Sequence, residues 1–385
     1  MTWRLDPTNI GTGLPLEGVR VLDFSRVLAG PLCAMIAGDL GADVIKVESP
    51  EGDPVRALAP PQLGDDATYF LAVNRHRRNV IADLRSPDDY EQVLQLVRDA
   101  DAVVENFLPR QVLSLGIDRL RAENPDCLWI SITPATTGGP IADLPAFDLL
   151  AQARSGLMGV TGDADAEPTK VGAPLADVVT GLYGAIGLLA GLFARGQGRA
   201  GRHFEAPLLE STMSALINQA QGYLSTGENP QRLGNDHPSI APYGPVTTAD
   251  GHLLLAVGTD AQYAKLVETL GSASLTGHKE WTTNAARVGS ITSLRRVLNQ
   301  IFVAHSTEDW LDILVSSGVP HAPILDVAGA FSQAQIRDGD FLGVMSTPSG
   351  ETTAMRTPLL IDGVRPVIRR GPRRLGEDTR EIFTA

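Results

Sequence analysis

Short apolar runs alternate with amphipathic stretches along the first part of the chain. Buried strands are predicted for five apolar runs, at residues 19–24, 43–48, 79–83, 102–105 and 127–132. Between them, Gly30 and Pro31 begin a predicted helix that Gly41 ends, and the stretch 87–98 has the period of another helix. Strands that alternate with helices favour an α/β fold whose parallel sheet is covered on both faces.

The pattern changes after residue 132. Helices are predicted over 147–157, from near Asp177 onward, and over 207–223 after a short link with strand character. A stretch rich in Gly, Pro and Asn at 227–245 indicates a domain boundary. A smaller α+β domain is expected beyond it, with a strand at 252–258, helices at about 260–270, 286–303 and 307–317, and short strands after residue 322.

Composition narrows the possible partners. The chain has 385 residues, of which 43% are hydrophobic and 20% are charged, as in ordinary folded proteins. Its net charge of −13 repels nucleic acid and anionic lipid at long range, so we expect no nucleic-acid partner. The longest apolar run, 182–194, is shorter than the ~20 residues that span a bilayer, which predicts a buried core helix and no membrane segment.

Two further features concern location and metals. Cys33 and Cys127 form no paired motif, which is typical of a protein in the reducing cytoplasm. The seven histidines show no spacing that suits a metal site, so none is expected. Glu48 ends a strand, as the ribose-binding acid of nicotinamide enzymes does, but SRVLAGP stands where their glycine code is needed. A nicotinamide cofactor is therefore disfavoured.

The densest basic cluster is NRHRRN at 74–79, with Arg85 just beyond it. Arg77, Arg78 and Arg85 suit a phosphorylated ligand because guanidinium groups bind phosphate through two hydrogen bonds, although such a charge cluster is more often a solvated surface. Asp177 opens the long apolar helix and has two interpretations. It is either an N-cap or a nucleophile that is ionised at neutral pH and attacks an activated acyl group.

Several motifs in fixed order resemble the class III coenzyme A transferases, the family of the CaiB/BaiF type. They are LEGVRVLDFSRVLAGP, GADVIKVESPEGDPVR, ENFLP, PAFDLLAQARSGLMGVTG and PTKVGAPLADVVTGLYGAIGLLA. The resemblance runs from about Leu16 to the LGEDTREIF ending. It implies an α/β fold with a large Rossmann-like domain of residues 1–225, a small α+β domain of residues 226–330, and a return to the large domain over 331–385. It also implies an interlocked homodimer.

For the reaction, the resemblance implies that Asp177 is the catalytic nucleophile. Its attack on an acyl-CoA forms a mixed anhydride, and CoA is then passed to a carboxylic acid. Acyl-CoA is thus a substrate, and no tightly bound cofactor is implied. The resemblance further places CoA contacts at Val27, Leu28 and Ala29, at 82–85, and at Asn106, Phe107 and Leu108. Arg77, Arg78 and Arg85 then become phosphate partners, and backbone NH groups near Gly138 and Gly139 become candidates for an oxyanion site.

Two alternatives remain within this resemblance. The racemase branch has a histidine where this chain has Phe147, and the loss of a proton carrier favours a transferase over a 2-methylacyl-CoA racemase. A catalytically idle CoA-binding protein is the other alternative. Leu28, Phe147 and Tyr243 predict an acyl pocket too apolar for oxalate, and Leu28 replaces a glutamine of formyl-CoA transferase.

Overall fold

The computed structural model describes residues 13–199 and 202–384, which form two compact units. The larger unit contains the described residues of 1–157, 170–228 and 334–385, and the smaller unit contains 158–169 and 229–333. The domain limits expected from the sequence lie within three residues of the divisions at 228/229 and 333/334. The segment 158–169 has no hydrophobic pattern of its own, and its place in the smaller unit was not predicted.

A six-stranded sheet, parallel throughout, forms the centre of the larger unit. Its strands are β1 (Arg20–Asp23), β2 (Asp43–Glu48), β5 (Arg77–Ile81), β6 (Ala102–Glu105), β7 (Leu128–Thr133) and β8 (His203–Pro207). They lie in the order β5-β2-β1-β6-β7-β8, which is the order 3-2-1-4-5-6 of doubly wound Rossmann-like sheets. The predicted parallel α/β sheet is confirmed, and the predicted link before residue 207 is its sixth strand.

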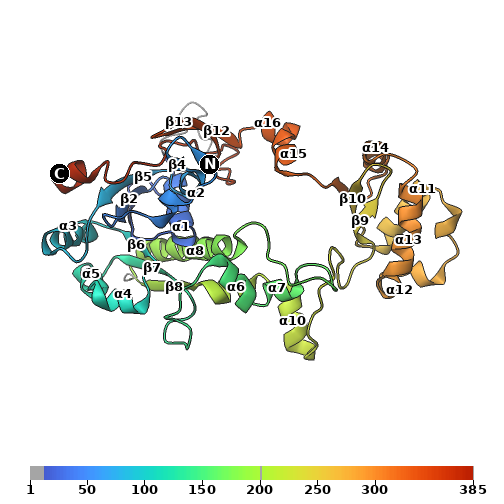
Figure 1. Cartoon of the computed structure of the whole chain (residues 1–385), viewed down its shortest axis with the longest axis horizontal. Helices are drawn as coiled ribbons and strands as arrows, with labels where there is room; N and C mark the ends of the chain where they lie inside the picture. The colour runs from blue at the N-terminus through green and yellow to red at the C-terminus, as the bar shows by residue number, and fades with distance from the viewer. Residues whose placement is uncertain (1–12, 200–201, 385) are drawn as a thin grey trace. The chain divides into compact units, whose positions relative to one another are not determined.

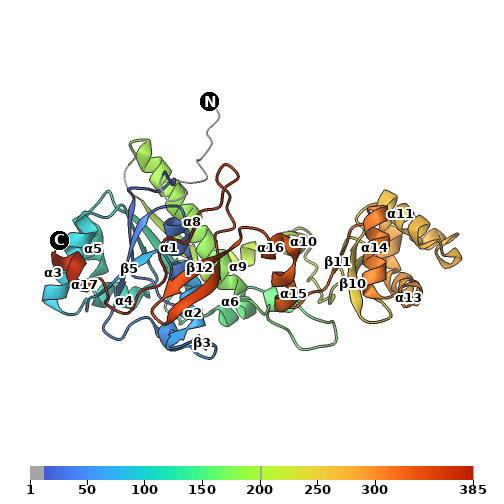
Figure 2. The same cartoon turned by 90° about the horizontal axis from the view of Figure 1, so that it is seen from above.

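Helices cover both faces of this sheet, as Figures 1 and 2 show. Helices α1 (Ala29–Asp39) and α8 (Leu175–Gly196) pack on the face to which Val21 points. Helices α3 (Pro87–Arg98) and α5 (Ile117–Glu123) pack on the opposite face, to which Leu22 points. Neighbouring residues of one strand thus enter two different cores, as the pleat requires.

Helix α8 is long and apolar enough to cross a membrane by length and composition alone, and this is weak evidence because core helices pass the same test. In the structure one side of α8 packs on α1 and on β7 and β8. The other side exposes Leu182, Tyr183, Ile186 and Phe193, of which Phe193 is 71% exposed. The predicted core helix is therefore buried along one side and exposed along the other.

The C-terminal segment returns to the sheet of the larger unit. After the hairpin of β12 (Leu342–Thr347) and β13 (Gly350–Met355), the chain runs along the edge strand β5. There Asp378 accepts a hydrogen bond from the Asn79 NH (2.7 Å) and donates its own NH to the Asn79 carbonyl oxygen (2.9 Å). These bonds satisfy backbone groups that an exposed edge strand leaves open.

The smaller unit has a three-stranded antiparallel sheet of β9 (Tyr243–Thr247), β10 (His252–Ala256) and β11 (His321–Pro323). Its main helices are α11 (Asp260–Leu270), α12 (Asn284–Gly289), α13 (Ile291–Phe302) and α14 (Thr307–Ser317). The helix predicted over 286–303 is two helices that meet at Ser290. Strand β9 was not predicted because it lies in the turn-rich stretch before β10.

The remaining elements connect these layers. They are the 3-10 helices at Pro54–Ala57, Ala273–Leu275 and Lys279–Trp281, the short strands β3 (Gln62–Leu63) and β4 (Asp66–Ala67), and the helices α2 (Thr68–Val73), α4 (Pro109–Ser114), α6 (Asp148–Arg154), α7 (Leu157–Val160), α9 (Leu208–Ser214), α10 (Ile217–Thr226), α15 (Val327–Ser332), α16 (Ala334–Arg337) and α17 (Thr379–Thr384). The helix predicted over 207–223 is interrupted between α9 and α10.

Candidate active site

Two adjoining cavities of the larger unit lie where the parallel strands end. The first has a volume of about 100 Å³ and lies after β1, β6 and β7; the second, of about 270 Å³, lies after β1, β2, β5 and β6. Arg26, which follows β1, lines both. The neighbours β1 and β6 are the strands at which the sheet order reverses, and ligands of open α/β sheets bind at this switch point.

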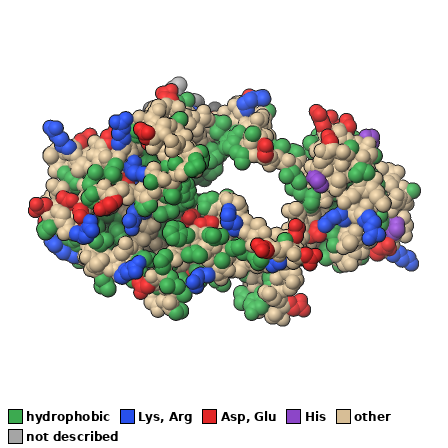
Figure 3. Space-filling model, viewed as in Figure 1, with side chains coloured by type: hydrophobic (Ala, Val, Ile, Leu, Met, Phe, Trp, Pro, Cys, Tyr) green, Lys and Arg blue, Asp and Glu red, His purple; other side chains and the backbone are tan. Residues whose placement is uncertain are grey.

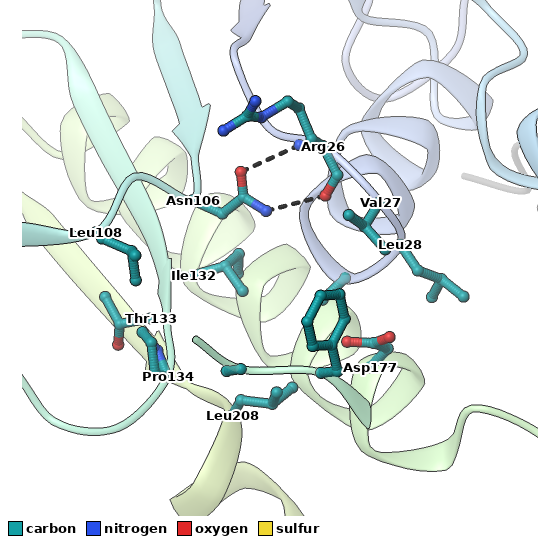
Figure 4. Close-up of a pocket in the computed structure, with 13 residues that line it drawn as sticks. Arg26, Val27, Leu28, Asn106, Leu108, Ile132, Thr133, Pro134, Asp177 and Leu208 are labelled. Atoms are coloured by element: carbon teal, nitrogen blue, oxygen red, sulfur yellow. Dashed lines mark hydrogen bonds between the residues drawn. The ribbon is translucent and has the colours of Figure 1, made fainter. Parts of the chain in front are cut away.

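A rigid turn separates β1 from α1 and borders the first cavity. The Asn106 side chain accepts a hydrogen bond from the Arg26 NH (3.1 Å) and donates one to the Arg26 carbonyl oxygen (2.9 Å), as drawn in Figure 4. Val27 has a φ of 71°, which is rare for a β-branched residue, and its NH donates to Asp53 (3.2 Å). The surrounding hydrogen bonds hold this strained backbone in place, as is common at functional sites.

A buried ionic network also supports this turn between β1 and α1. The Lys46 ammonium donates to the Ser25 carbonyl oxygen (2.7 Å) and pairs with Asp53 (3.0 Å). Asp23 pairs with the Arg77 guanidinium (3.1 Å). Because these four charged residues are almost fully buried and compensate one another, removal of any one would leave an unpaired charge in the interior.

Asp177 lines the first cavity from the start of α8 (Figure 4). It is the third residue of the helix, and Pro174 occupies the N-cap position without a side-chain hydrogen bond. The N-cap interpretation of Asp177 is therefore wrong. Asp148, the first residue of α6, supplies the acceptor instead, through bonds from the NH groups of Ala176 (2.8 Å) and Asp177 (3.4 Å).

The electrostatic surroundings of Asp177 change its protonation. Burial, and after it the charge of the neighbouring Asp148, raises the pKa of Asp177 to about 7. The aspartate that was expected to be ionised at neutral pH from its ordinary pKa therefore titrates close to pH 7 in this cavity. A carboxyl group perturbed in this way, inside a cavity, is a candidate for catalysis.

Most of the predicted CoA contacts meet at these two cavities. Val27, Leu28, Ala29, Asn106 and Leu108 line the first cavity together with Asp177. Phe107 and Arg85 line the second, as do the other residues of 82–85. Arg85 is 66% exposed and binds Asp83 through two hydrogen bonds of 2.8 and 2.9 Å.

Arg77 and Arg78 do not join this group, and their assignment as phosphate partners is corrected. The Arg77 side chain is 2% exposed and binds Asp23, Asn74 and the carbonyl oxygens of Val73 and Pro31. Its donors therefore face the interior. Arg78 lies in the amino-terminal half of β5, away from the strand ends that form the cavities, and binds Asp43 through two hydrogen bonds (3.2 and 2.5 Å).

Three other expectations concerned the oxyanion site, the residues of the acyl pocket and a metal site. The Gly139 NH donates to the Thr136 carbonyl oxygen (3.1 Å), so it is committed to a turn, and neither Gly138 nor Gly139 lines the first cavity. Phe147 does line it beside Leu28, whereas Tyr243 belongs to the smaller unit. Among residues 13–199 and 202–384, no group of three or more His, Cys, Asp or Glu side chains could hold a metal ion.

Sequence reasoning missed three residues of the site. Arg26 could have been found as the cation that directly follows the first predicted strand. Asp148 and Gln152 stand one helical turn apart in FDLLAQ, and the Gln152 side chain donates to Asp148 (2.7 Å). No local signal shows that this pair reaches the start of α8, because the contact joins residues almost thirty positions apart.

The fold and the site define a doubly wound α/β protein whose switch point holds a perturbed carboxyl group next to a second, larger cavity. Residues 16–379 match CoA-transferase family III, and the chain belongs to this family. It is accordingly a CoA-transferase, which uses acyl-CoA as a substrate.

Known proteins resemble the chain over nearly its whole length. It is 36% identical to the succinate–glutarate CoA-transferase of Agrobacterium fabrum, covering 96% of this chain and 95% of that protein. It is 36% identical to the succinyl-CoA:mesaconate CoA-transferase of Haloarcula marismortui, covering 87% of each. The crystal structure of a CaiB/BaiF family protein from Brucella suis superposes with a TM-score of 0.86 at 36% identity, covering 97% of this chain and 99% of that one.

Proposed function

We propose that this CoA-transferase moves CoA between an acyl-CoA and a carboxylic acid through a mixed anhydride on Asp177. The observation that carries the proposal is the position of the Asp177 carboxylate: it lines a small, largely apolar cavity that shares Arg26 with a larger one. A carboxylate in such a place can attack a thioester, while the apolar walls exclude the water that would hydrolyse the anhydride.

Each step of this reaction exchanges one anion for another. The Asp177 carboxylate attacks the thioester carbonyl carbon, the C–S bond breaks, and CoA leaves as a thiolate. The acceptor carboxylate attacks the acyl carbon of the anhydride and releases Asp177. The thiolate then attacks the carbonyl of the acceptor in the new anhydride, and the donor acid leaves. No net proton transfer is needed, which agrees with a first-cavity lining that includes no histidine.

The two cavities suggest the path of CoA. The thioester lies at Asp177, the pantetheine arm passes the turn of Val27 to Ala29 and the segment from Asn106 to Leu108, and the nucleotide occupies the second cavity. Arg85 and Arg26 line that cavity and supply positive charge for phosphate. This path uses the local charge of two arginines against the net charge of −13, which salt screens over ~8 to 10 Å.

For the acids, we propose short dicarboxylates, with a succinyl donor. The support comes from the two relatives, a succinate–glutarate and a succinyl-CoA:mesaconate CoA-transferase, whose names specify dicarboxylates. The first cavity, at about 100 Å³, has room for a short acyl chain.

Mass spectrometry tests the covalent step. Brief incubation with succinyl-CoA followed by hydroxylamine should label the peptide that contains Asp177, and Asp177→Ala and Asp177→Asn should abolish both label and exchange with glutarate. Asp143→Ala, which removes an exposed carboxylate of the preceding loop, is the matched control and should keep both. Full exchange by Asp177→Ala would refute the mechanism.

Deuterium exchange and calorimetry address the two alternatives, a racemase and an idle CoA-binding protein. Phe147 lines the first cavity where a racemase requires a second proton carrier, so no deuterium should enter the α-position of 2-methylacyl-CoAs in heavy water. An idle CoA-binding protein would bind CoA in calorimetry and exchange it with no acid of a panel.

We also propose that the protein is a homodimer. The exposed side of α8, defined by Leu182, Tyr183, Ile186 and Phe193, is an apolar surface of the kind that a second copy covers. Figure 3 shows hydrophobic side chains gathered on the face of the larger unit that is in view. Light scattering should give twice the chain mass. Ile186→Glu should weaken the dimer, whereas Arg296→Glu on an exposed face of the smaller unit should not.

A further inference from the structure

Asp148 holds the first turn of α8 from outside that helix. Its Oδ1 accepts hydrogen bonds from the NH groups of Ala176 (2.8 Å) and Asp177 (3.4 Å), two of the donors that the first turn of a helix leaves without partners. Pro174, at the N-cap position, offers no side-chain acceptor. The backbone of Asp177 is therefore positioned by a carboxylate from α6, a separate helix.

Gln152 fixes the orientation of Asp148. The Gln152 side chain is fully buried, and its Nε2 donates to Asp148 Oδ2 (2.7 Å). Its Oε1 accepts a hydrogen bond from the Val171 NH (2.8 Å), in the segment that leads into α8. Both polar atoms of the Gln152 amide are thus used to join α6 to the chain that carries Asp177, so the Asp148 carboxylate has little freedom to turn away.

The charge of Asp148 reaches Asp177 as well. Three groups from other elements face or surround Asp177: Asp148 from α6, Tyr69 from α2, and Arg26 from the turn after β1. Burial raises the pKa of Tyr69 to about 12, with Asp177 and Asp148 contributing, so the phenol is neutral at physiological pH. Asp148 is the charge that shifts the pKa of Asp177 upward beyond the effect of burial.

We propose that Asp148 is a positioning residue for the reaction, which fixes the backbone of Asp177 and makes its carboxylate a stronger nucleophile through like-charge repulsion. A carboxylate that holds a proton more tightly is more basic, and a more basic oxygen is the stronger nucleophile once it is ionised. The proposal rests on the proposed covalent role of Asp177. Asp148 is not among the residues that line the first cavity, so the proposed role acts through Asp177.

The pH profile of exchange tests the charge component. Asp148→Asn keeps an oxygen acceptor for the two NH groups but removes the charge. The acid limb of kcat/KM, expected near pH 7, should move to lower pH, and the plateau at pH 8.5 should fall several-fold because the nucleophile is weaker. A limb that stays in place overturns the proposal. Asp148→Ala removes the same charge, so its limb must move as far; it provides the test if the amide variant does not fold.

Two further variants separate positioning from charge. Gln152→Leu leaves the Asp148 charge but releases its side chain, so the limb should stay near pH 7 while kcat falls. Asp326→Asn removes a carboxylate that caps another helix by accepting from the Gly329 NH (2.7 Å), and it should change neither limb nor plateau.

If Asp177→Ala retains exchange, the covalent mechanism fails and this role with it. If Asp177→Ala is inactive and Asp148→Asn has an unshifted limb, the role of Asp148 alone is refuted.

Discussion

Gly181→Ala should disturb the active site through the packing of α8 on α1. A Cβ at residue 181 would lie 2.7 Å from the Ala29 carbonyl oxygen and 3.0 to 3.1 Å from the Leu32 side chain, whereas ordinary contacts begin at 3.4 Å. The backbone oxygen cannot rotate aside, so the helices must separate by about 0.7 Å. Overpacking of this kind costs ~1 to 3 kcal/mol, against the ~1 kcal/mol that alanine gains over glycine in a helix.

The displaced groups belong to the site. Ala29 borders the first cavity, which Asp177 also lines. Asp177 stands four residues before Gly181 on α8. A shift approaching 1 Å at reacting groups lowers rates by up to ~100-fold, so we expect kcat to fall ten-fold or more while the melting temperature drops by a few degrees. The assay is succinyl-CoA exchange with thermal unfolding of the same sample.

Gly196→Ala is the matched control on the same helix. No atom lies within 4 Å of the Cβ position at Gly196, so this variant should gain ~0.5 to 1 kcal/mol in stability and keep full activity. If Gly181→Ala behaves like Gly196→Ala in both measurements, the close approach of α8 to α1 does not position the site.

Three further predictions concern other parts of the molecule. Asp177→Asn should raise the melting temperature more at pH 8 than at pH 5: the folded pKa of about 7 exceeds the unfolded value, so ionised Asp177 costs the folded state up to a few kcal/mol above pH 7 and progressively less as the pH falls toward 4. Equal gains at both pH values would contradict this. Asn106→Leu removes both hydrogen bonds to the Arg26 backbone, worth ~0.5 to 1.5 kcal/mol each, and should raise the KM for acyl-CoA in steady-state kinetics; an unchanged KM would show that the turn holds without them. Arg287→Met removes a buried guanidinium that donates to the Ala241 and Trp281 carbonyl oxygens and to the exposed Asp260, and should destabilise the smaller unit by ~1 to 3 kcal/mol for each carbonyl oxygen that loses its donor; hydrogen exchange should accelerate in α11 and α13 and not in β1.

Local pattern was enough to find the sheet but not the chemistry that surrounds it. The apolar runs of β1, β2 and β6 were recognised because residues buried on both faces of a parallel sheet leave a continuous signal. Arg77 and Arg78 were misassigned because nothing in NRHRRN distinguishes a guanidinium that points inward to a buried carboxylate from one that points to solvent. The structure resolves this through Asp23, more than fifty residues away in the chain.

The position of Asp177 shows a second limit. Its membership of the site was expected from the resemblance, but the cap interpretation failed because α8 begins two residues earlier than assumed, at Leu175. Helix ends are read from sequence with this uncertainty, and here two residues decide whether a carboxylate caps a helix or faces a cavity. The raised pKa was equally out of reach, since Asp148 approaches from another helix.

The pairing of Asp378 with the edge strand β5 has a consequence for synthesis on the ribosome. Asp378, which covers the edge of β5, is made 299 residues after Asn79 of that strand. Throughout elongation, including the whole time in which the smaller unit is produced, the larger unit has an open sheet edge. A nascent chain in this condition can pair with another through that edge, and truncation of the last few residues would leave the finished protein in the same state. The edge of the sheet is therefore protected from pairing with other chains only once the segment around Asp378 has been made and has docked on β5.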